Sequence, residues 1–418
     1  MSKLITKKIN KAKVVIYPVE YVRSVQINVT INCGSWYENE NNRGYFHFLE
    51  HMLFHGNRKF PSSEEMMAFA KDNGIYTNAS TSGKEINYYL QVPDINLYSG
   101  LIALEETIFY PLIPEDKIKN EIGVVAQEIK SHWDRPETRF YNQSDILIFG
   151  ENHPYVQDPL GNMKSLQQIS STILKKLHQQ YFQPQNMVIT IVGNIKNIDI
   201  LVDKLTKILK KHPNNFLSKF SPPAINPSSS KVFVYHDKPE QETISLVWIL
   251  RNKQKPNREQ RVSQKLFSNI IGNSVDSYLF KIFRLKYGLV YKINSQVYNY
   301  DNCSFFEIYC QIDPQNSSKF FEVFDQELPF IFSKINLHVF KKMIKYQDFQ
   351  SLMTYDSIKD LSQWIIFQAN NYKSIFMPED YVKLAKKINF NKTYSFFKDK
   401  LLSGEKYTFQ MTPIKPEN

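Results

Sequence analysis

A five-residue segment, His-Phe-Leu-Glu-His at His47–His51, limits the possible structures of this chain more than any other part of the sequence. Its order reads HxxEH, the reverse of the zinc-binding motif HExxH. If residues 43–55 form a helix, His47 and His51 lie one turn apart on one face. Two imidazoles so placed can bind one metal ion, while Glu50 beside them handles a water molecule. The spacing therefore predicts the site of a zinc hydrolase.

The residues around this motif indicate that its helix is buried. Residues 44–54 are apolar nearly all the way round, which is typical of a buried helix. Two histidines and a glutamate in such a helix need polar partners, because unpaired buried polar groups are costly. A metal ion satisfies all three side chains. The alternative is a core helix whose histidines bond to backbone carbonyls.

A catalytic zinc site has three protein ligands and one open position, so the chain should supply a third ligand. The best candidates lie in residues 117–133. Four apolar residues recur there at helical spacing and define a buried face: Ile118, Ile122, Val125 and Ile129. Glu121 and Glu128 stand two turns apart at one edge of that face. One of them can bind the metal while the other braces a ligand, although glutamates on an amphipathic helix are often only solvated.

Together these two segments resemble the pitrilysin, insulin-degrading and mitochondrial-processing peptidases, also called inverzincins. In that family the HxxEH helix is followed by a second helix that carries a glutamate ligand, preceded by a further glutamate. The resemblance implies one Zn²⁺ per chain, bound by His47, His51 and Glu128, with Glu50 as general base and Glu121 in support. Three other histidines stay outside this expected site because the ligand set is complete: His55, His132 and His153.

A second motif of this resemblance is Arg-Leu-Lys-Tyr-Gly-Leu-Val-Tyr at residues 284–291. Gly288 allows a turn between a helix and a strand at 289–295. The family's Arg–Tyr pair approaches the zinc from an opposing domain. The resemblance therefore implies that Arg284 holds the peptide and that Tyr291 donates to the developing oxyanion. An ordinary surface arginine and a strand tyrosine are the alternative.

Residues 76–82 and 85–90 predict two adjacent short strands. In the family, the corresponding Asn-Ala strand lies beside the metal, and the substrate adds to its edge as an extra strand. The resemblance makes Asn78 and Ala79 the candidates for that edge, where backbone pairing binds a peptide with little sequence specificity. A plain buried hairpin is the alternative.

The chain of 418 residues is long enough for more than one domain. Residues 213–230 contain four prolines and a serine run, a composition typical of an inter-domain linker. We therefore expect an N-terminal zinc-binding peptidase domain at 1–212. A homologous C-terminal domain at 231–418 lacks HxxEH and carries Arg–Tyr.

Strands and helices alternate on both sides of the linker, with strands near 13–18, 24–32, 186–192, 231–236 and 242–250 and a helix near 259–271. This pattern predicts an α+β fold of two homologous α/β sandwich domains, each an antiparallel-rich sheet packed by helices. The resemblance implies that the two domains form half of a clamshell.

Composition limits the other function classes. Hydrophobic residues make up 42% and charged residues 22%, and no apolar run approaches the ~20 residues of a membrane span, so no membrane role is expected. The basic N-terminus lacks the apolar segment of a secretory signal. Cys33, Cys303 and Cys310 have no metal-type spacing and favour a reducing, cytoplasmic location. The net charge of +11 can steer acidic peptides, but no basic cluster with interleaved aromatics indicates nucleic-acid binding.

The length of the chain is closest to the short branch of the family, in which two chains close one chamber. Because this chain keeps both the zinc motif and Arg–Tyr, we expect a homodimer, with a heterodimer of related chains as an alternative. The expected function is a zinc metalloendopeptidase that hydrolyses peptides or unfolded segments inside that chamber. A processing peptidase that removes one targeting or leader sequence would have the same site. The third possible function is that of a non-catalytic scaffold subunit, like the core subunits of respiratory complexes.

Overall fold

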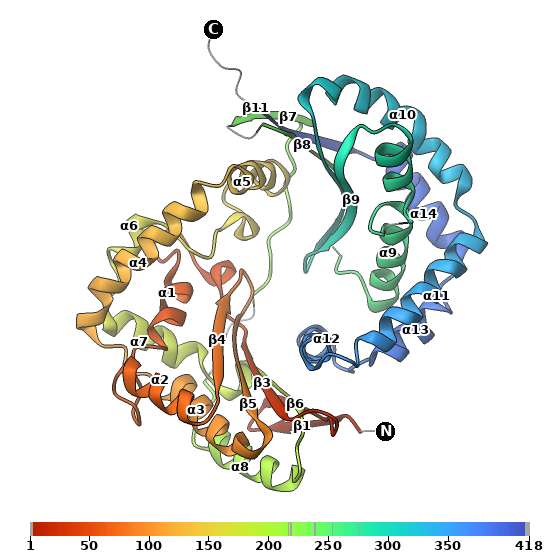
Figure 1. The fold of residues 1–418 in the computed structure, drawn as a ribbon. Helices are drawn as coiled ribbons and strands as arrows, with labels where there is room; N and C mark the ends of the chain where they lie inside the picture. Colours follow the sequence, from red (N-terminus) through yellow and green to blue (C-terminus); the bar gives the residue numbers. More distant parts are fainter. Residues whose placement is uncertain are drawn as a thin grey trace. The chain divides into compact units, whose positions relative to one another are not determined.

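The computed structural model describes residues 3–215, 217, 220–237, 240–252, 254–274 and 276–413. These residues form two compact units, each with one β-sheet and its own helices (Figure 1). The first unit takes the described residues up to His132 together with Gln157–Ser221 and Thr354–Met377, and the second takes Trp133–Val156, Pro222–Met353 and those from Pro378 onward. Two sheets packed by helices confirm the predicted α+β fold class. None of the described helices combines the length and the apolar sequence that a bilayer span requires.

The sheet of the first unit has the strand order β1-β2-β6-β3-β5-β4. Its strands are β1 (Ile5–Ile9), β2 (Ala12–Pro18), β3 (Ser24–Ile31), β4 (Tyr76–Thr81), β5 (Ile86–Pro93) and β6 (Met187–Gly193). Strands β2 and β6 run parallel, and every other neighbouring pair is antiparallel. The order leaves β4 at one end of the sheet, beside the elements that carry the HxxEH motif.

The sheet of the second unit has the strand order β7-β11-β8-β10-β9. Its strands are β7 (Val232–Asp237), β8 (Glu242–Asn252), β9 (Val290–Asn299), β10 (Cys303–Ile312) and β11 (Lys406–Pro413). The first pair is parallel and the other three are antiparallel. This sequence of pairings repeats β2-β6-β3-β5-β4 of the first sheet, as the predicted homology of the two domains requires.

Helices cover both faces of the first sheet. Those of this unit are α1 (Tyr45–Met52), α2 (Ser63–Asp72), α3 (Leu97–Phe109), α4 (Glu115–Trp133), α6 (Met163–Leu166), α7 (Ser171–Tyr181), α8 (Ile198–Lys210) and α12 (Ile358–Asn371). Apolar residues of α1, α3, α4, α7 and α8 pack with one face of the sheet in a single core. Residues of α12 pack on the opposite face, where Val15 and Val192 contact Leu361 and Ile365. Strands β2 and β6 are therefore buried on both sides, which explains their nearly continuous apolar sequences.

The second unit is built in the same way. Its helices are α5 (Pro136–Phe149), α9 (Arg258–Ile271), α10 (Ser317–Lys334), α11 (Leu337–Met353), α13 (Pro378–Ala385) and α14 (Phe390–Ser403). One sheet face, which includes Trp248 and Phe306, packs in a core with α9, α10 and α14. Helix α5 lies over the opposite face of this sheet, where the Phe149 and Phe305 rings are 5.4 Å apart.

The predicted domain boundaries differ from the structure in one respect. The two units meet in sequence between Ser221 and Pro222, inside the predicted linker 213–230, of which positions 216, 218 and 219 lie outside the described residues. However, residues 133–156 belong to the second unit and residues 354–377 to the first, so 1–212 and 231–418 are not the units that pack. Composition marks a linker, but it carries no signal for which sheet face a distant helix covers.

We predict that Ile365→Ala in α12 destabilises the first unit by about 2–5 kcal/mol, because Ile365 is fully buried and the substitution leaves a cavity. Gln363→Ala on the exposed side of α12 is the control and should change stability by less than about 0.5 kcal/mol. Urea unfolding followed by circular dichroism measures both. Equal effects of the two substitutions would show that α12 does not cover the sheet.

Candidate metal centre

Helix α1 carries the HxxEH motif and is held at its start by a buried carboxylate. The two oxygens of Glu38 accept hydrogen bonds from the backbone N–H groups of Gly44 (2.7 Å) and Phe46 (2.8 Å). These are N–H groups that the helix itself leaves unpaired, and a negative charge is favourable there. Gly44 has φ +86°, and a Cβ at this position would lie 2.6 Å from the carbonyl oxygen of Leu160. Both features fix where α1 begins and therefore where its histidines point.

The structure brings the predicted metal ligands together. The rings of His47 and His51 lie one turn apart on α1, with centroids 4.6 Å apart. The Oε2 atom of Glu128 in α4 lies 3.7 Å from Nε2 of His47 and 3.6 Å from Nε2 of His51. The ligand atoms of all three residues lie within 4.8 Å of one another.

This donor set fits a zinc ion. Bonds of about 2.0–2.1 Å in tetrahedral geometry place neighbouring donors about 3.3–3.4 Å apart, which is a few tenths of an ångström less than the 3.6 and 3.7 Å from Glu128 to the two histidines. The separation of the two imidazole nitrogens is at most 4.8 Å, and zinc binding requires the histidines to reach the same spacing of about 3.3–3.4 Å. Two imidazole nitrogens and one carboxylate oxygen are also the ligand types of a catalytic zinc site with a fourth position open. The chain therefore supplies the complete three-ligand set in the described part of the first unit.

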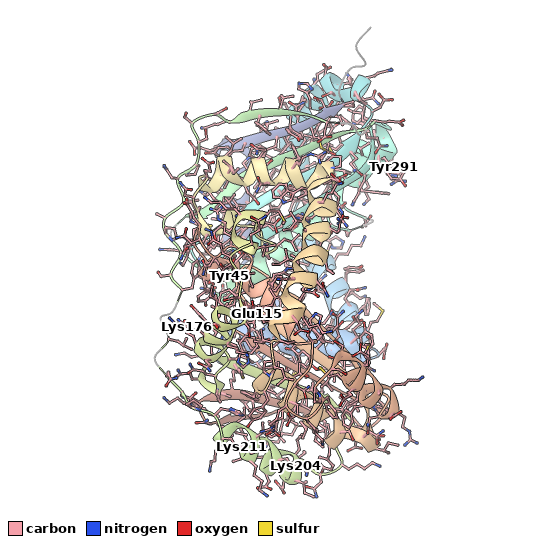
Figure 2. All side chains as sticks on the ribbon, turned by 90° about the vertical axis from the view of Figure 1, so that its left-hand side faces the viewer. Tyr45, Glu115, Lys176, Lys204, Lys211 and Tyr291 are labelled. Carbon is pink, nitrogen blue, oxygen red and sulfur yellow. The ribbon has the colours of Figure 1, made fainter. Side chains whose placement is uncertain are left out.

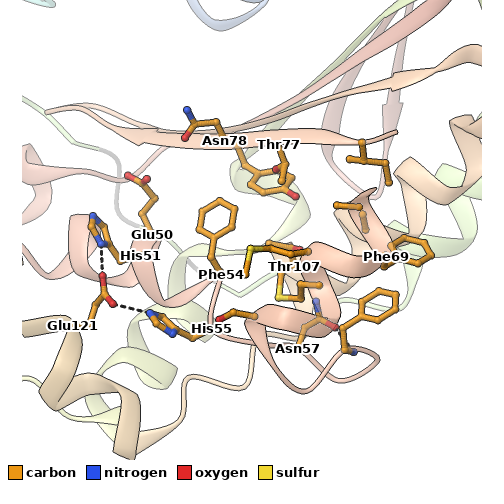
Figure 3. Close-up of a pocket in the computed structure, with 18 residues that line it drawn as sticks. Glu50, His51, Phe54, His55, Asn57, Phe69, Thr77, Asn78, Thr107 and Glu121 are labelled. Carbon is orange, nitrogen blue, oxygen red and sulfur yellow. Dashed lines mark hydrogen bonds and ion pairs between the residues drawn. The ribbon is translucent and has the colours of Figure 1, made fainter. Parts of the chain in front are cut away.

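The protonation state of His47 and the hydrogen bond of His51 favour metal binding, although nearby carboxylates raise the pKa of His51. Burial and the neighbouring His51 lower the pKa of His47 to about 4, so the imidazole is neutral at pH 7 and has a lone pair free. Nδ1 of His51 lies 2.6 Å from Oε1 of Glu121 (Figure 3). This contact makes Nδ1 the proton-bearing atom of His51 and leaves Nε2, which faces Glu128, as the ligand atom.

A third histidine, His55, is not one of the three candidate ligands but contacts the bracing carboxylate of Glu121. Its Nε2 lies 2.7 Å from Oε2 of Glu121, opposite the contact with His51 (Figure 3). Hydrogen bonds from His51 and then His55 lower the pKa of Glu121 to about 2, which keeps this carboxylate ionised. The spacing of four residues from His51 was the sequence signal for this role. The other two excluded histidines lie elsewhere, with His132 against Asp158 and His153 against the carbonyl of Pro223.

Glu50 lies beside the ligands, and its side chain is oriented by a residue that was not predicted from the sequence. The hydroxyl of Thr81, the last residue of β4, donates to Oε2 of Glu50 at 2.7 Å. Burial raises the pKa of Glu50, although the Thr81 hydrogen bond and the charge of His51 oppose the rise. The result is a buried, oriented carboxyl group with a stronger affinity for a proton than a solvated glutamate has.

Strand β4 passes the cluster as the end strand of its sheet (Figure 3). It pairs with β5 on one side, and no described strand pairs with its other edge. Asn78 is exposed on this strand, and its side-chain oxygen accepts the backbone N–H of Ala79 at 2.8 Å. An added strand can replace this local hydrogen bond, so the edge is suited to binding an extended peptide. The alternative of a plain buried hairpin is therefore wrong.

A cavity of 540 Å³ lies next to Glu50 and His51. Its walls are mainly apolar and come from α1, α2, β4, β5 and α3, with Phe54, Phe69 and Tyr88 among the lining residues (Figure 3). A space of this size and polarity suits a large apolar side chain.

Arg284 and Tyr291 lie together in the second unit. A π-helix over Phe280–Lys286 is followed by Gly288 with φ +62°, so glycine makes the predicted turn before β9. Nη1 of Arg284 donates to the carbonyl oxygen of Tyr291 at 2.7 Å. The side chain of Tyr291 is 67% exposed and projects from β9 (Figure 2). Arg284 and Tyr291 thus contact each other within the second unit, and the side chain of Tyr291 is exposed.

Comparisons with known proteins find similarity to peptidase families and to zinc proteases. Residues 13–145 match the family "Insulinase (Peptidase family M16)", and residues 168–343 match "Peptidase M16 inactive domain". An "Uncharacterized zinc protease" of Rickettsia bellii is 28% identical over 305 residues, which cover 73% of this chain and 72% of the relative. The "Uncharacterized zinc protease YmxG" of Bacillus subtilis is 27% identical, with 72% of this chain and 71% of the relative covered.

The fold is similar to that of solved structures as well. A protease from Helicobacter pylori has a TM-score of 0.83 at 20% identity, covering 99% of this chain and all of the other. At this identity the likeness concerns the fold alone, with its two sheets and packed helices.

We predict that Glu121→Gln lowers zinc affinity by about 10–100-fold, because the amide no longer fixes His51 as the carboxylate does. Asp116→Asn, an exposed carboxylate change on the same helix, should leave affinity unchanged. Competition with a fluorescent chelator measures both. Unchanged affinity in Glu121→Gln would mean that the contact seen with His51 does not support the metal.

Proposed function

We propose that this chain, which belongs to the insulinase family of peptidases (family M16), is a zinc-dependent endopeptidase that hydrolyses peptides or unfolded segments. The observation that carries the proposal is the convergence of two imidazole nitrogens and one carboxylate beside the buried carboxyl group of Glu50. A purely structural cluster has no need of an open fourth position or of an oriented base next to it.

In this proposal His47, His51 and Glu128 hold one zinc ion per chain, and Glu121 orients His51. A bound zinc ion supplies Lewis acidity, which lowers the pKa of water and polarises a carbonyl group. The buried, neutral state of His47 keeps its lone pair available near neutral pH.

Glu50 is the proposed general base. Its raised pKa makes it a better proton acceptor than a solvated carboxylate, and Thr81 fixes one of its oxygens. Glu50 accepts a proton from the attacking water and then delivers it to the nitrogen of the leaving amine. Both transfers use the same oriented side chain.

The substrate is proposed to bind as an added strand along β4 at Asn78 and Ala79. Backbone pairing of this kind accepts many sequences and requires an extended, unfolded chain. The adjacent cavity of 540 Å³ then takes one apolar side chain, since burying a large apolar group there is favourable by about 1.5–3 kcal/mol.

Arg284 and Tyr291 are proposed to complete the site from the partner chain of a homodimer, with the Tyr hydroxyl stabilising the oxyanion and the Arg holding the peptide. The exposure of Tyr291 and its contact with Arg284 support a role outside its own unit. A heterodimer with a related chain would use the same groups. The cytoplasmic location stays a prediction, supported by the free, buried thiols of Cys33, Cys303 and Cys310.

A processing peptidase that removes one leader sequence would use the same residues. One substrate cleaved at a fixed bond far faster than many other peptides would identify that role. A scaffold without activity is disfavoured because the ligand set and Glu50 are all retained.

We predict that Glu50→Gln keeps the fold and the zinc content but lowers the rate of peptide hydrolysis by roughly two to four decades, because the amide cannot accept the proton from water. Cleavage of a quenched fluorescent peptide, normalised to zinc measured in the same sample, tests this. Wild-type rates in a zinc-loaded Glu50→Gln protein would remove Glu50 from the mechanism.

We also predict that two inactive variants, His47→Ala and Arg284→Ala, recover about a quarter of wild-type activity when they are mixed and allowed to exchange subunits. About half of the dimers are then mixed, and each has one intact site with zinc from one chain and Arg284 from the other. A mixture of His47→Ala with Glu50→Gln is the control and should stay inactive. No recovery despite proven exchange would contradict a site shared between chains.

A further inference from the structure

The second unit contains a cavity of 330 Å³ between α5 and the sheet face that α5 covers. It is lined by Tyr141, Ser144 and Asp145 of α5 and by alternate residues of the strands, among them Ser245 of β8 and Glu307 of β10. All of these residues belong to the second unit, so the cavity is separate from the cluster at His47. Nothing in the proposed peptidase mechanism uses it.

Two carboxyl groups face this cavity. Glu307 is 3% exposed and fully hydrogen-bonded, since Oε1 accepts from the hydroxyl of Ser245 at 2.5 Å and Oε2 accepts from the amide of Gln296 at 2.9 Å. Asp145 is half-buried and lines the cavity, and no hydrogen bond to its carboxyl group is found among the described residues. Because Glu307 already accepts hydrogen bonds and Asp145 accepts none from the described residues, Asp145 is the carboxyl group that is available to a ligand in this cavity.

Among the described residues that line this cavity, none carries a positive charge that could compensate these acids. The described residues that line the cavity include no lysine, arginine or histidine. Burial and the charge of Glu307 raise the pKa of Asp145 to about 7. Two carboxyl groups in one cavity, with no basic side chain among the described lining residues, favour a cation as the ligand.

The walls of the cavity indicate what kind of cation fits. Aromatic rings supply much of the lining, with the Phe149 ring 5.0 Å from Tyr300 and 5.4 Å from Phe305. Ring faces attract cations, and they also bury apolar carbon. A calcium ion needs 6–8 oxygen ligands, whereas this cavity offers two carboxyl groups and mainly apolar surface. Its volume also lies in the range of small-molecule sites.

We propose that this cavity binds a small organic cation, a protonated primary amine on a short apolar chain. The ammonium group donates hydrogen bonds to Asp145 and lies near Glu307, and the carbon chain packs against the tyrosine and phenylalanine rings. The site is independent of peptide hydrolysis, since none of its residues belongs to the candidate metal centre.

The test is a titration of the full-length, zinc-loaded protein with n-butylammonium chloride, followed by ligand-observed NMR. The neutral analogue 1-butanol has the same chain length and reports apolar binding alone. The amine should bind at least about tenfold more tightly than the alcohol, because only the amine pairs with the carboxyl groups. Asp145→Asn should lose at least about tenfold in amine affinity and keep its zinc, which excludes binding of the amine at the metal.

Asp399→Asn, an exposed carboxylate change in the same unit, is the matched control and should bind the amine as the wild type does. Circular dichroism verifies the fold of each variant, and Glu307→Gln provides the same test if Asp145→Asn fails to fold. Equal affinity of the wild type for amine and alcohol would overturn the proposal without any variant. Amine binding that survives Asp145→Asn would overturn it as well.

Discussion

The candidate metal centre depends on one carboxylate, Glu121, which joins α1 and α4. Its two oxygens contact His51 near the end of α1 and His55, which follows α1 in sequence. Glu128 lies two turns further along α4. The two contacts of Glu121 therefore also set the distance between Glu128 and the ligand nitrogens of α1. The low pKa of Glu121 keeps this carboxylate charged throughout the neutral range, so mild acidification does not break its contacts with the two histidines.

The rest of the first unit holds these two helices in place. Glu38 fixes the start of α1, the apolar face of α1 packs in the main core, and Thr81 of β4 reaches Glu50. The sheet that carries β4 is buried on its far side by α12, a helix from the C-terminal half of the chain. In the second unit α5 has the equivalent position and leaves a cavity with an unpaired acid. The repeated plan thus places the candidate metal centre in one unit and the proposed amine site in the other.

Local patterns in the sequence were sufficient for much of this account. The spacing of His47 and His51 and the pair of glutamates in 117–133 predicted the cluster, and the alternation of strands and helices predicted both sheets. Helix α5 packs in the second unit although it lies in the N-terminal half of the sequence, and α12 packs in the first unit although it lies in the C-terminal half. The sequence could not predict this, because it depends on which distant helix covers a sheet face. The contact of Thr81 with Glu50 was missed for the same reason, since β4 and α1 meet only in the folded unit.

X-ray absorption spectroscopy at the zinc edge of the purified, zinc-loaded protein reports the ligands of the metal directly. Binding by His47, His51 and Glu128 predicts a shell of light-atom ligands at about 2.0–2.1 Å with the outer-shell signal of two imidazoles and no sulfur. Each of the three proposed ligands contributes to that shell. A spectrum without an imidazole signal, or a protein that binds no zinc at all, would show that His47 and His51 do not hold a zinc ion.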